Sequence, residues 1–288
     1  MSDAGATVAE AIRAAATQLA EVSDTARLDA ELLMAHTLSA TRSELLLRHT
    51  RDPAPPAFAA LIERRMAHEP VAYILGTQEF RGLAFAVTPA VLIPRADSET
   101  TLEAALEAAP DARRVLDCGT GSGALLLAFL FERPDATGVG IDRSVEALAI
   151  AAANAARHGL TDRVQMLEAD WDTPGWAADL GQFDLIISNP PYVETVADIA
   201  RQVRDHEPAG ALFAGPEGLD AYRILIPQLP KLLTGGGTVV LEIGASQAEA
   251  VTTIATNHGF TCDLCRDLGG RPRALILRLG LGKAGPSG

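Results

Sequence analysis

The chain has 288 residues, 48% of them hydrophobic, which suits a main domain of about 200 residues with a smaller one beside it. Its formal net charge is −13, from 37 acidic and 24 basic residues. Nucleic-acid-binding proteins usually carry an excess of basic residues that neutralises phosphates, so this charge disfavours a naked RNA or DNA substrate. No segment supplies the roughly 18 apolar residues of a membrane span, and the acidic amphipathic start is unlike a signal peptide. We therefore expect a soluble, cytoplasmic protein.

The three cysteines, Cys118, Cys262 and Cys265, are too few for a disulfide framework and indicate a reducing compartment. Cys262 and Cys265 lie in "FTCDLC", which has the composition of a strand. Residues three apart in a strand point to opposite faces of the sheet, and no second Cys or His pair completes a set of four ligands. We therefore expect no metal site.

The first 75 residues are predicted to form a small helical domain. Apolar residues recur every three or four positions in "VAEAIRAAATQLAEV", "ARLDAELLMAHTL" and "AFAALIERRMAH". Residues 76–95 are predicted to form a linker containing a β-hairpin, because "QEFRGLAFAV" alternates across an Arg-Gly turn. The prolines of "VTPAVLIPR" keep the next segment extended, and a helix is predicted to begin near Asp97 or Ser98.

Residues 96–280 are predicted to form an α/β catalytic domain, followed by a disordered tail at 281–288. Five β-rich runs, several of them separated by helical patterns, predict a parallel sheet covered by helices: "RRVLDC", "ATGVGID", "RVQMLEAD", "FDLIIS" and "GTVVLEIG". The helix between the second and third runs is predicted to start after Ser144 and stop at Gly159. The last two strands, "FTCDLC" and "RALILRL", are too close for a helical crossover and are predicted to be antiparallel.

A glycine-rich loop, "LDCGTGSG", joins the first of these strands to a helix. Gly119, Gly121 and Gly123 allow a ligand to approach the backbone closely, which predicts a nucleotide-like ligand. The loop also fits a dinucleotide fingerprint. Asp117, directly before it, would repel a pyrophosphate and attract a cation such as the sulfonium of S-adenosylmethionine. No histidine stands at a strand end for hydride chemistry, so we favour S-adenosylmethionine over a nicotinamide.

Two further strand ends carry candidate cofactor contacts. Asp142 closes "GVGID" and suits ribose hydroxyls under either interpretation of the loop, although it would also serve as a cap for the next helix. Asp170 and Trp171 close "LEADW", where Trp171 would help to wall the adenine site. A tryptophan at a strand end is also common at the edge of a core.

The fourth strand ends on Asn189-Pro190-Pro191-Tyr192. The prolines fix the backbone, so the Asn189 side-chain oxygen and the Pro190 carbonyl form two rigid acceptors. Two such acceptors suit an NH2 group on a planar π system, and holding both N–H groups favours the positive charge that develops as the nitrogen attacks a methyl group. Tyr192 can cover the flat face of that group. In isolation the tetrad is only a strand stop, but its position after the glycine loop favours an amino-methyltransferase.

The chain resembles the glutamine N5-methyltransferases of the peptide chain release factor type over nearly its whole length. The resemblance is carried by "DAELLMAH", "EPVAYILGTQEFRGLAFAVTPAVLIPRADSE", "LDCGTGSG", "GID", "ADW", "SNPPYV", "EPAGALFAGPEGL" and "LEIG". The family usually has I-P-R-P-[DE]-T-E where this chain has Ala96 and Ser98, and usually Leu where it has Cys118. The resemblance implies a seven-stranded, Rossmann-like methyltransferase sheet with the last strand antiparallel, behind an N-terminal helical domain that docks a protein substrate.

The resemblance also implies the site residues. Contacts to S-adenosylmethionine, which becomes S-adenosylhomocysteine, fall on Gly119, Thr120, Gly121, Ser122, Gly123, Asp142, Trp171 and Asn189. The substrate glutamine would be held by Asn189, Pro190, Pro191 and Tyr192, of which Asn189, Pro190 and Tyr192 are the catalytic candidates. That glutamine lies in the Gly-Gly-Gln loop of class 1 release factors.

The expected partner is therefore a class 1 release factor, with no direct contact to nucleic acid and with the enzyme as a monomer. The alternatives are a glutamine of a ribosomal protein, an exocyclic amine of a nucleic-acid base, a nicotinamide oxidoreductase and a non-catalytic cofactor-binding scaffold. A base methylase must extract its base and grip the phosphates, which the net charge of −13 disfavours.

Overall fold

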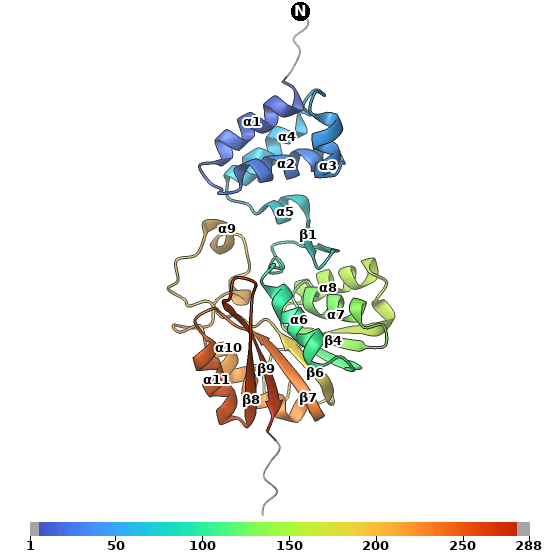
Figure 1. Ribbon diagram of the computed structural model, residues 1–288, viewed down its shortest axis with the longest axis vertical. Helices are drawn as coiled ribbons and strands as arrows, with labels where there is room; N and C mark the ends of the chain where they lie inside the picture. Colours follow the sequence, from blue (N-terminus) through green and yellow to red (C-terminus); the bar gives the residue numbers. More distant parts are fainter. Residues whose placement is uncertain (1–5, 281–288) are drawn as a thin grey trace, which may run out of the picture. The chain divides into compact units, whose positions relative to one another are not determined.

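The computed structural model describes residues 6–280 (Figure 1). The chain divides into two compact units. The first, called here the helical unit, contains the residues up to Thr77 together with Ile199–His206. The second, the sheet unit, contains Gln78–Asp198 and the residues from Glu207 onward. The tail predicted at 281–288 lies outside the described residues, and no helix between residues 6 and 280 is long and apolar enough to cross a membrane.

The helical unit follows the predicted periodicity. Its helices are α1 (Val8–Leu19), α2 (Ala26–Thr37), α3 (Arg42–Glu44), α4 (Ala57–Met66), α5 (Val71–Leu75) and α9 (Arg201–Arg204), with a π-helical turn at Leu45–His49. A capping box starts α1: the backbone N–H of Glu10 donates to Thr7 Oγ1 at 3.3 Å, and the backbone N–H of Thr7 donates to Glu10 Oε2 at 2.8 Å. The apolar face of α1 is buried against α2 and α4.

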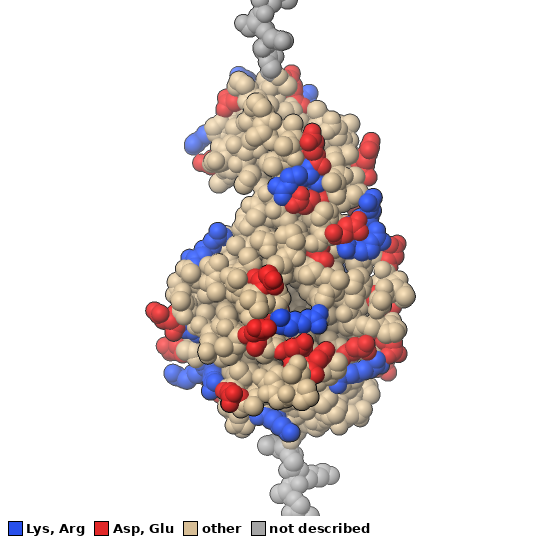
Figure 2. Space-filling model, turned by 180° about the vertical axis from the view of Figure 1, so that it is seen from behind, with Lys and Arg blue, Asp and Glu red and all other residues tan. Residues whose placement is uncertain are grey.

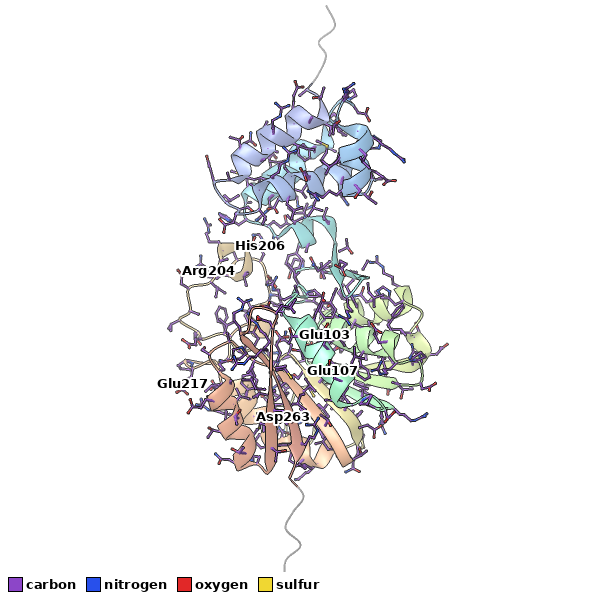
Figure 3. The ribbon with its side chains drawn as sticks, in the orientation of Figure 1. Glu103, Glu107, Arg204, His206, Glu217 and Asp263 are labelled. Carbon is purple, nitrogen blue, oxygen red and sulfur yellow. The ribbon has the colours of Figure 1, made fainter. Side chains whose placement is uncertain are left out.

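Ile199–His206 belongs to the helical unit although only ten residues, 189–198, separate it from the strand that ends at Ser188. Arg65 of α4 donates from Nε to Asp29 Oδ2 of α2 at 2.8 Å, in a buried ion pair, and from Nη2 to Gln202 Oε1 at 3.0 Å. His206, at the end of the segment (Figure 3), donates from Nε2 to the Ala67 carbonyl at 3.2 Å. No sequence pattern indicates this packing, because the segment is polar and lacks a periodic apolar pattern.

The predicted hairpin is present as β1 (Thr77–Phe80) and β2 (Leu83–Ala86). Its turn places Arg81 at φ +52° and Gly82 at φ +75°, a left-handed pair that matches the twist of a two-residue hairpin. Helix α6 (Ser98–Ala108) begins where predicted. The prediction that Asp97 or Ser98 acts as a cap is not met, because neither side chain caps the helix; Asp97 instead pairs with Arg273 at 2.7 Å.

The sheet has seven strands in the order β5-β4-β3-β6-β7-β9-β8. In chain order they are β3 (Arg114–Cys118), β4 (Thr137–Asp142), β5 (Val164–Glu168), β6 (Phe183–Ser188), β7 (Leu233–Glu242), β8 (Phe260–Arg266) and β9 (Pro272–Leu279). β9 runs antiparallel to both of its neighbours, and β3 to β7 are parallel. This confirms the predicted fold class, including the antiparallel last strand.

Helices cover both faces of this sheet (Figure 1). α6, α7 (Ala124–Glu132) and α8 (Val145–Arg157) lie on one face, while α10 (Asp220–Leu225) and α11 (Ala248–Asn257) lie on the other. Successive strand residues enter different cores, as Val115 and Leu116 do. Cys262 and Cys265 likewise pack against opposite cores, as predicted. The parallel strands therefore all deliver their carboxyl ends to one edge.

Candidate active site

A cavity of about 460 Å³ opens in the sheet unit at the carboxyl ends of the strands. It is lined from the loops that follow β3, β4, β5 and β6, and also from the segment before α6 and the segment 208–215. Figure 2 shows a hollow in the surface of this unit, bordered by acidic and basic side chains. A cavity of this size at this edge is where open parallel sheets bind nucleotide-like ligands.

The glycine loop is held against β4 by backbone bonds. The N–H groups of Gly119 and Thr120 both donate to the Ile141 carbonyl, at 2.9 and 2.8 Å. Gly119 has φ +76°, and a Cβ there would lie 3.1 Å from Cη2 of Trp171. Both the backbone conformation and the nearby indole therefore require glycine at this position.

Asp117 supplies an unpaired buried acceptor at the end of β3. Its Oδ2 accepts a hydrogen bond from Thr120 Oγ1 at 2.7 Å, while its Oδ1 has no hydrogen-bond partner among residues 6–280. Burial raises the pKa of Asp117 from 3.8 to about 7 against the Thr120 bond, and the nearby Asp142 carboxylate adds to the increase. An orphaned carboxylate oxygen lining a cavity suits a cationic or N–H-bearing ligand.

Asp142 has structural partners as well as a place in the cavity wall. Its Oδ2 accepts from the Gly121 N–H at 3.0 Å and its Oδ1 from the Ser144 N–H at 2.9 Å. The Ser144 hydroxyl accepts from the Ala147 N–H at 3.1 Å, which confirms Ser144 as the cap of α8, and Gly159 lies two residues beyond the helix with φ +68°. Asp142 thus connects the glycine loop to the start of α8. Its place in the cavity wall fits a contact to ribose hydroxyls, and its bond to the Ser144 N–H fits a role at the start of the helix.

Trp171 forms part of the cavity wall opposite Gly119. Its backbone carbonyl accepts from Gln228 Nε2 at 3.1 Å, and Gln228 Oε1 accepts from Trp176 Nε1 at 2.6 Å. The short segment after β5 is therefore fastened to the 3-10 helix Ile226–Leu232, and the indole of Trp171 has a fixed place beside the glycine loop.

The Asn-Pro-Pro-Tyr tetrad begins directly after β6, which pairs with β3 so that Ser188 lies opposite Cys118. Asn189 and Gly119 therefore leave adjacent strands at the same level. Asn189 Nδ2 donates to Ser98 Oγ at 3.4 Å, so its Oδ1 is the atom left to accept from a substrate. Tyr192 donates from its hydroxyl to Glu242 Oε1 at 3.4 Å, and burial raises its pKa, so it stays a neutral donor.

The cavity brings together most of the residues predicted from the sequence. Those that line it are Gly119, Thr120, Gly121, Ser122, Asp142, Trp171, Asn189 and Pro191. Gly123, Pro190 and Tyr192 lie outside the lining. Gly123 instead precedes α7 with φ +83°, Pro190 is buried, and the Tyr192 hydroxyl is engaged by Glu242.

Sequence reasoning assigned no role to two buried carboxylates, Glu207 and Glu242. Glu207 accepts from the Ile93 N–H at 3.1 Å and pairs with Arg95, which lines the cavity. Glu242 ends β7 and is 1% exposed. Glu242 could have been found, because a charged residue closing the apolar run "TVVLE" at the carboxyl edge has the same placement as Asp117. Glu207 begins the segment "EPAGALFAGPEGL" that carries part of the resemblance, but nothing in this polar loop indicated that its carboxylate would be buried.

The chain matches two family models, one described as "PrmC N-terminal domain" over residues 10–76 and one as "Methyltransferase domain" over residues 110–258. A protein of Geobacter sulfurreducens named release factor glutamine methyltransferase is 42% identical over 266 residues, which are 89% of this chain and 91% of that protein. A protein of Cereibacter sphaeroides with the same name is 42% identical over 279 residues, 94% and 98% of the two chains.

Solved structures agree with the fold. The catalytic domain of hMettl16 aligns with a TM-score of 0.54 at 14% identity, over 78% of this chain and 94% of that one. A methyltransferase from Pyrococcus furiosus aligns with a TM-score of 0.50 at 18% identity, over 76% and 96%. At these identities the likeness concerns the fold alone.

Proposed function

The chain belongs to the release factor glutamine methyltransferase family, and from this membership we propose that it methylates the side-chain amide nitrogen, N5, of a glutamine in a peptide chain release factor. We propose the Gly-Gly-Gln glutamine of class 1 release factors as the target. S-adenosylmethionine supplies the methyl group from its sulfonium centre and leaves as S-adenosylhomocysteine.

The residues around the cavity fit this cofactor. The glycine loop offers close backbone approach, Trp171 offers a flat apolar wall, and the unpaired Oδ1 of Asp117 favours a cation. We propose that contacts to the cofactor come from Gly119, Thr120, Gly121, Ser122, Gly123, Asp142, Trp171 and Asn189. For Gly123, which lies outside the cavity lining, the contribution would be to the shape of the loop.

The tetrad would hold the glutamine. Asn189 Oδ1 and the Pro190 carbonyl would accept the two N–H groups of the substrate amide, which orients its nitrogen and favours the charge that develops on it. Pro191 and Tyr192 would keep this segment rigid and enclose the amide. The observation that carries the proposal is the pairing of β3 with β6. Because these strands are neighbours, Asn189 follows β6 beside the point where the glycine loop follows β3, and both line the cavity.

We further propose that the helical unit docks the release factor, and that the enzyme acts as a cytoplasmic monomer without direct contact to nucleic acid. The domain boundaries proposed for this division are 1–75, 76–95 and 96–280. The net charge of −13 supports recognition of a protein rather than of exposed phosphates.

The test is methyl transfer from labelled S-adenosylmethionine to a purified class 1 release factor. We expect label on the wild-type factor and none on a factor whose Gly-Gly-Gln glutamine is changed to alanine. The variant Asn189→Ala should lower kcat by roughly 100-fold or more, since it removes an acceptor aimed at developing charge. Label on a ribosomal protein or on RNA instead of the release factor would overturn the proposed substrate, and an unchanged rate for Asn189→Ala would overturn the proposed role of the tetrad.

A further inference from the structure

We propose that Glu242 and Ser98 are positioning residues that fix which end of the Asn189 amide faces the substrate. In this arrangement the Glu242 carboxylate accepts a hydrogen bond from the Ser98 hydroxyl. Ser98 Oγ is then left as an acceptor for the Asn189 NH2 group, and Asn189 must present its oxygen to the glutamine. The inference rests on the proposed function and deepens it, because it adds two residues behind the tetrad to the machinery that orients the substrate.

The contacts form one chain from β7 to the tetrad. Asn189 Nδ2 donates to Ser98 Oγ at 3.4 Å, and Ser98 lies close enough to the Glu242 carboxylate for its hydroxyl to lower the pKa of that group. The same carboxylate accepts from Thr101 Oγ1 at 3.4 Å and from the Tyr192 hydroxyl at 3.4 Å. Ser98 and Thr101 are both buried on α6, and Ser98 also lines the cavity beside Asn189. Glu242 thus touches the tetrad directly through Tyr192 and indirectly through Ser98.

The direction of these bonds follows from the chemistry of each group. An ionised carboxylate can only accept, so in the proposed arrangement the Ser98 hydroxyl donates to Glu242. A hydroxyl has one hydrogen, so Ser98 can only accept from Asn189, which must then offer its NH2 group. A protonated Glu242 can donate instead. Ser98 would be free to donate to Asn189, and the amide could turn its NH2 group toward the substrate, where two donors would face one another.

The charge on Glu242 is set by groups on every element packed around it. Burial raises the pKa of Glu242 to about 7, against the hydroxyls of Ser98 and Thr101 and the guanidinium of Arg273, while Asp97 raises it further. Arg273 of β9 is shared with Asp97 at 2.7 Å and with Asp267 at 3.1 Å.

Two tyrosines complete the surroundings of Glu242. Tyr192 donates to its side chain, and Tyr222 of α10 donates to its backbone carbonyl at 2.8 Å. Neither tyrosine carries a charge near neutral pH, since burial raises the pKa of both. The ionisation of Glu242 near neutral pH therefore determines which groups donate and which accept among Asn189, Ser98 and Glu242.

The test compares four variants of the full-length enzyme with wild type, using labelled S-adenosylmethionine at saturation and a release factor as substrate. Ser98→Ala should lower kcat roughly 10- to 100-fold, the usual scale for groups that orient a functional side chain. Its dissociation constant for S-adenosylmethionine, measured by calorimetry, should stay within about twofold. Ser98→Thr keeps the hydroxyl and should recover most of the loss. Thr101→Val is the matched control when the rates are compared well above pH 7, where Glu242 is ionised in every variant that retains it, because it removes the neighbouring hydroxyl from the same carboxylate without touching Asn189.

The pH dependence gives a readout that a purely structural role would not move. Wild-type kcat should rise as pH increases through about 7, where Glu242 loses its proton. Glu242→Gln cannot ionise, so its kcat should be low and should lack this rise. Saturating cofactor removes the separate effect of Asp117 on cofactor binding.

The outcomes separate the two proposals. A wild-type enzyme that labels no release factor glutamine overturns the proposed function and this inference with it. An active wild type with Ser98→Ala at full kcat, or with an equal loss in Thr101→Val, overturns the positioning role alone. If Glu242→Gln fails to fold, Ser98→Ala still decides, because it adds no polar group to the core.

Discussion

Replacing Asp117 by asparagine should make the free protein more stable and the cofactor bind less tightly. The two side chains have nearly the same shape, and the asparagine oxygen can still accept from Thr120. The change removes the negative charge and puts an NH2 group in place of Oδ1, the oxygen that has no partner among the described residues. Stability and binding should therefore move in opposite directions, which a general packing defect would not produce.

The magnitude follows from the pKa of Asp117. That pKa is about 7 in the folded protein against an ordinary value of 3.8, and each unit corresponds to about 1.4 kcal/mol, so ionisation in the folded state costs about 4 kcal/mol. Because the folded pKa is the higher one, the free energy of unfolding is unaffected below about pH 4, falls as pH rises toward 7, and is lowest above it. Asp117→Asn should lack this fall, so its advantage over wild type should grow to a few kcal/mol by pH 8.

The assay is urea unfolding at several pH values between 5 and 8, with calorimetric titration of S-adenosylmethionine at the same values. We expect wild-type affinity for the cofactor to increase with pH as Asp117 ionises, and the affinity of Asp117→Asn to be lower and flat. Asp135→Asn, at an exposed carboxylate of the same unit, is the control and should follow wild type. Parallel pH curves for wild type and Asp117→Asn, in both stability and affinity, would refute the reasoning.

Two further changes test the glycine loop and the helical unit. Gly119→Ala forces a Cβ to within 3.1 Å of Trp171 at φ +76° and should weaken cofactor binding at least 10-fold. The control, Gly259→Ala, has φ +86° with nothing within 4 Å, so it should cost only about 1 kcal/mol of stability and leave the affinity unchanged. Equal cofactor affinities of the two variants in calorimetry would contradict this. Asp29→Ala leaves Arg65 as a buried charge without its carboxylate partner and should lower the free energy of unfolding by about 3–5 kcal/mol. Adding Arg65→Met to this variant should recover part of the loss. If the losses of the two single changes instead add up in thermal unfolding, the ion pair is not what stabilises this site.

The sequence patterns predicted the parts of the fold that depend on periodicity. The alternation of strands with helices, the hairpin at Arg81-Gly82 and the antiparallel last strand are all present. Strand ends were also informative, because the carboxyl edge of a parallel sheet gathers the residues that follow its strands. This rule predicts that Gly119, Asp142 and Asn189 lie close together, and all three line one cavity.

The missed features depend on long-range pairing, which leaves no local pattern. A buried Glu207 is stabilised by Arg95 and by the Ile93 N–H, more than 100 residues earlier in the chain. The polar segment at 199–206 packs with Arg65 in the same way. The bond between Ser98 and Asn189 is of this kind too, since a serine at the start of a helix predicts only a cap.

The return of Ile199–His206 to the helical unit has a consequence for any attempt to exchange substrate specificity between relatives. The chain passes between the two units three times, after Thr77, after Asp198 and after His206. A chimera spliced only near Thr77 would pair a foreign α4 with the native partners of Arg65 and Ala67. The module that must be transplanted is discontinuous, and grafting 199–206 together with the N-terminal helices is the exchange that keeps those partners matched.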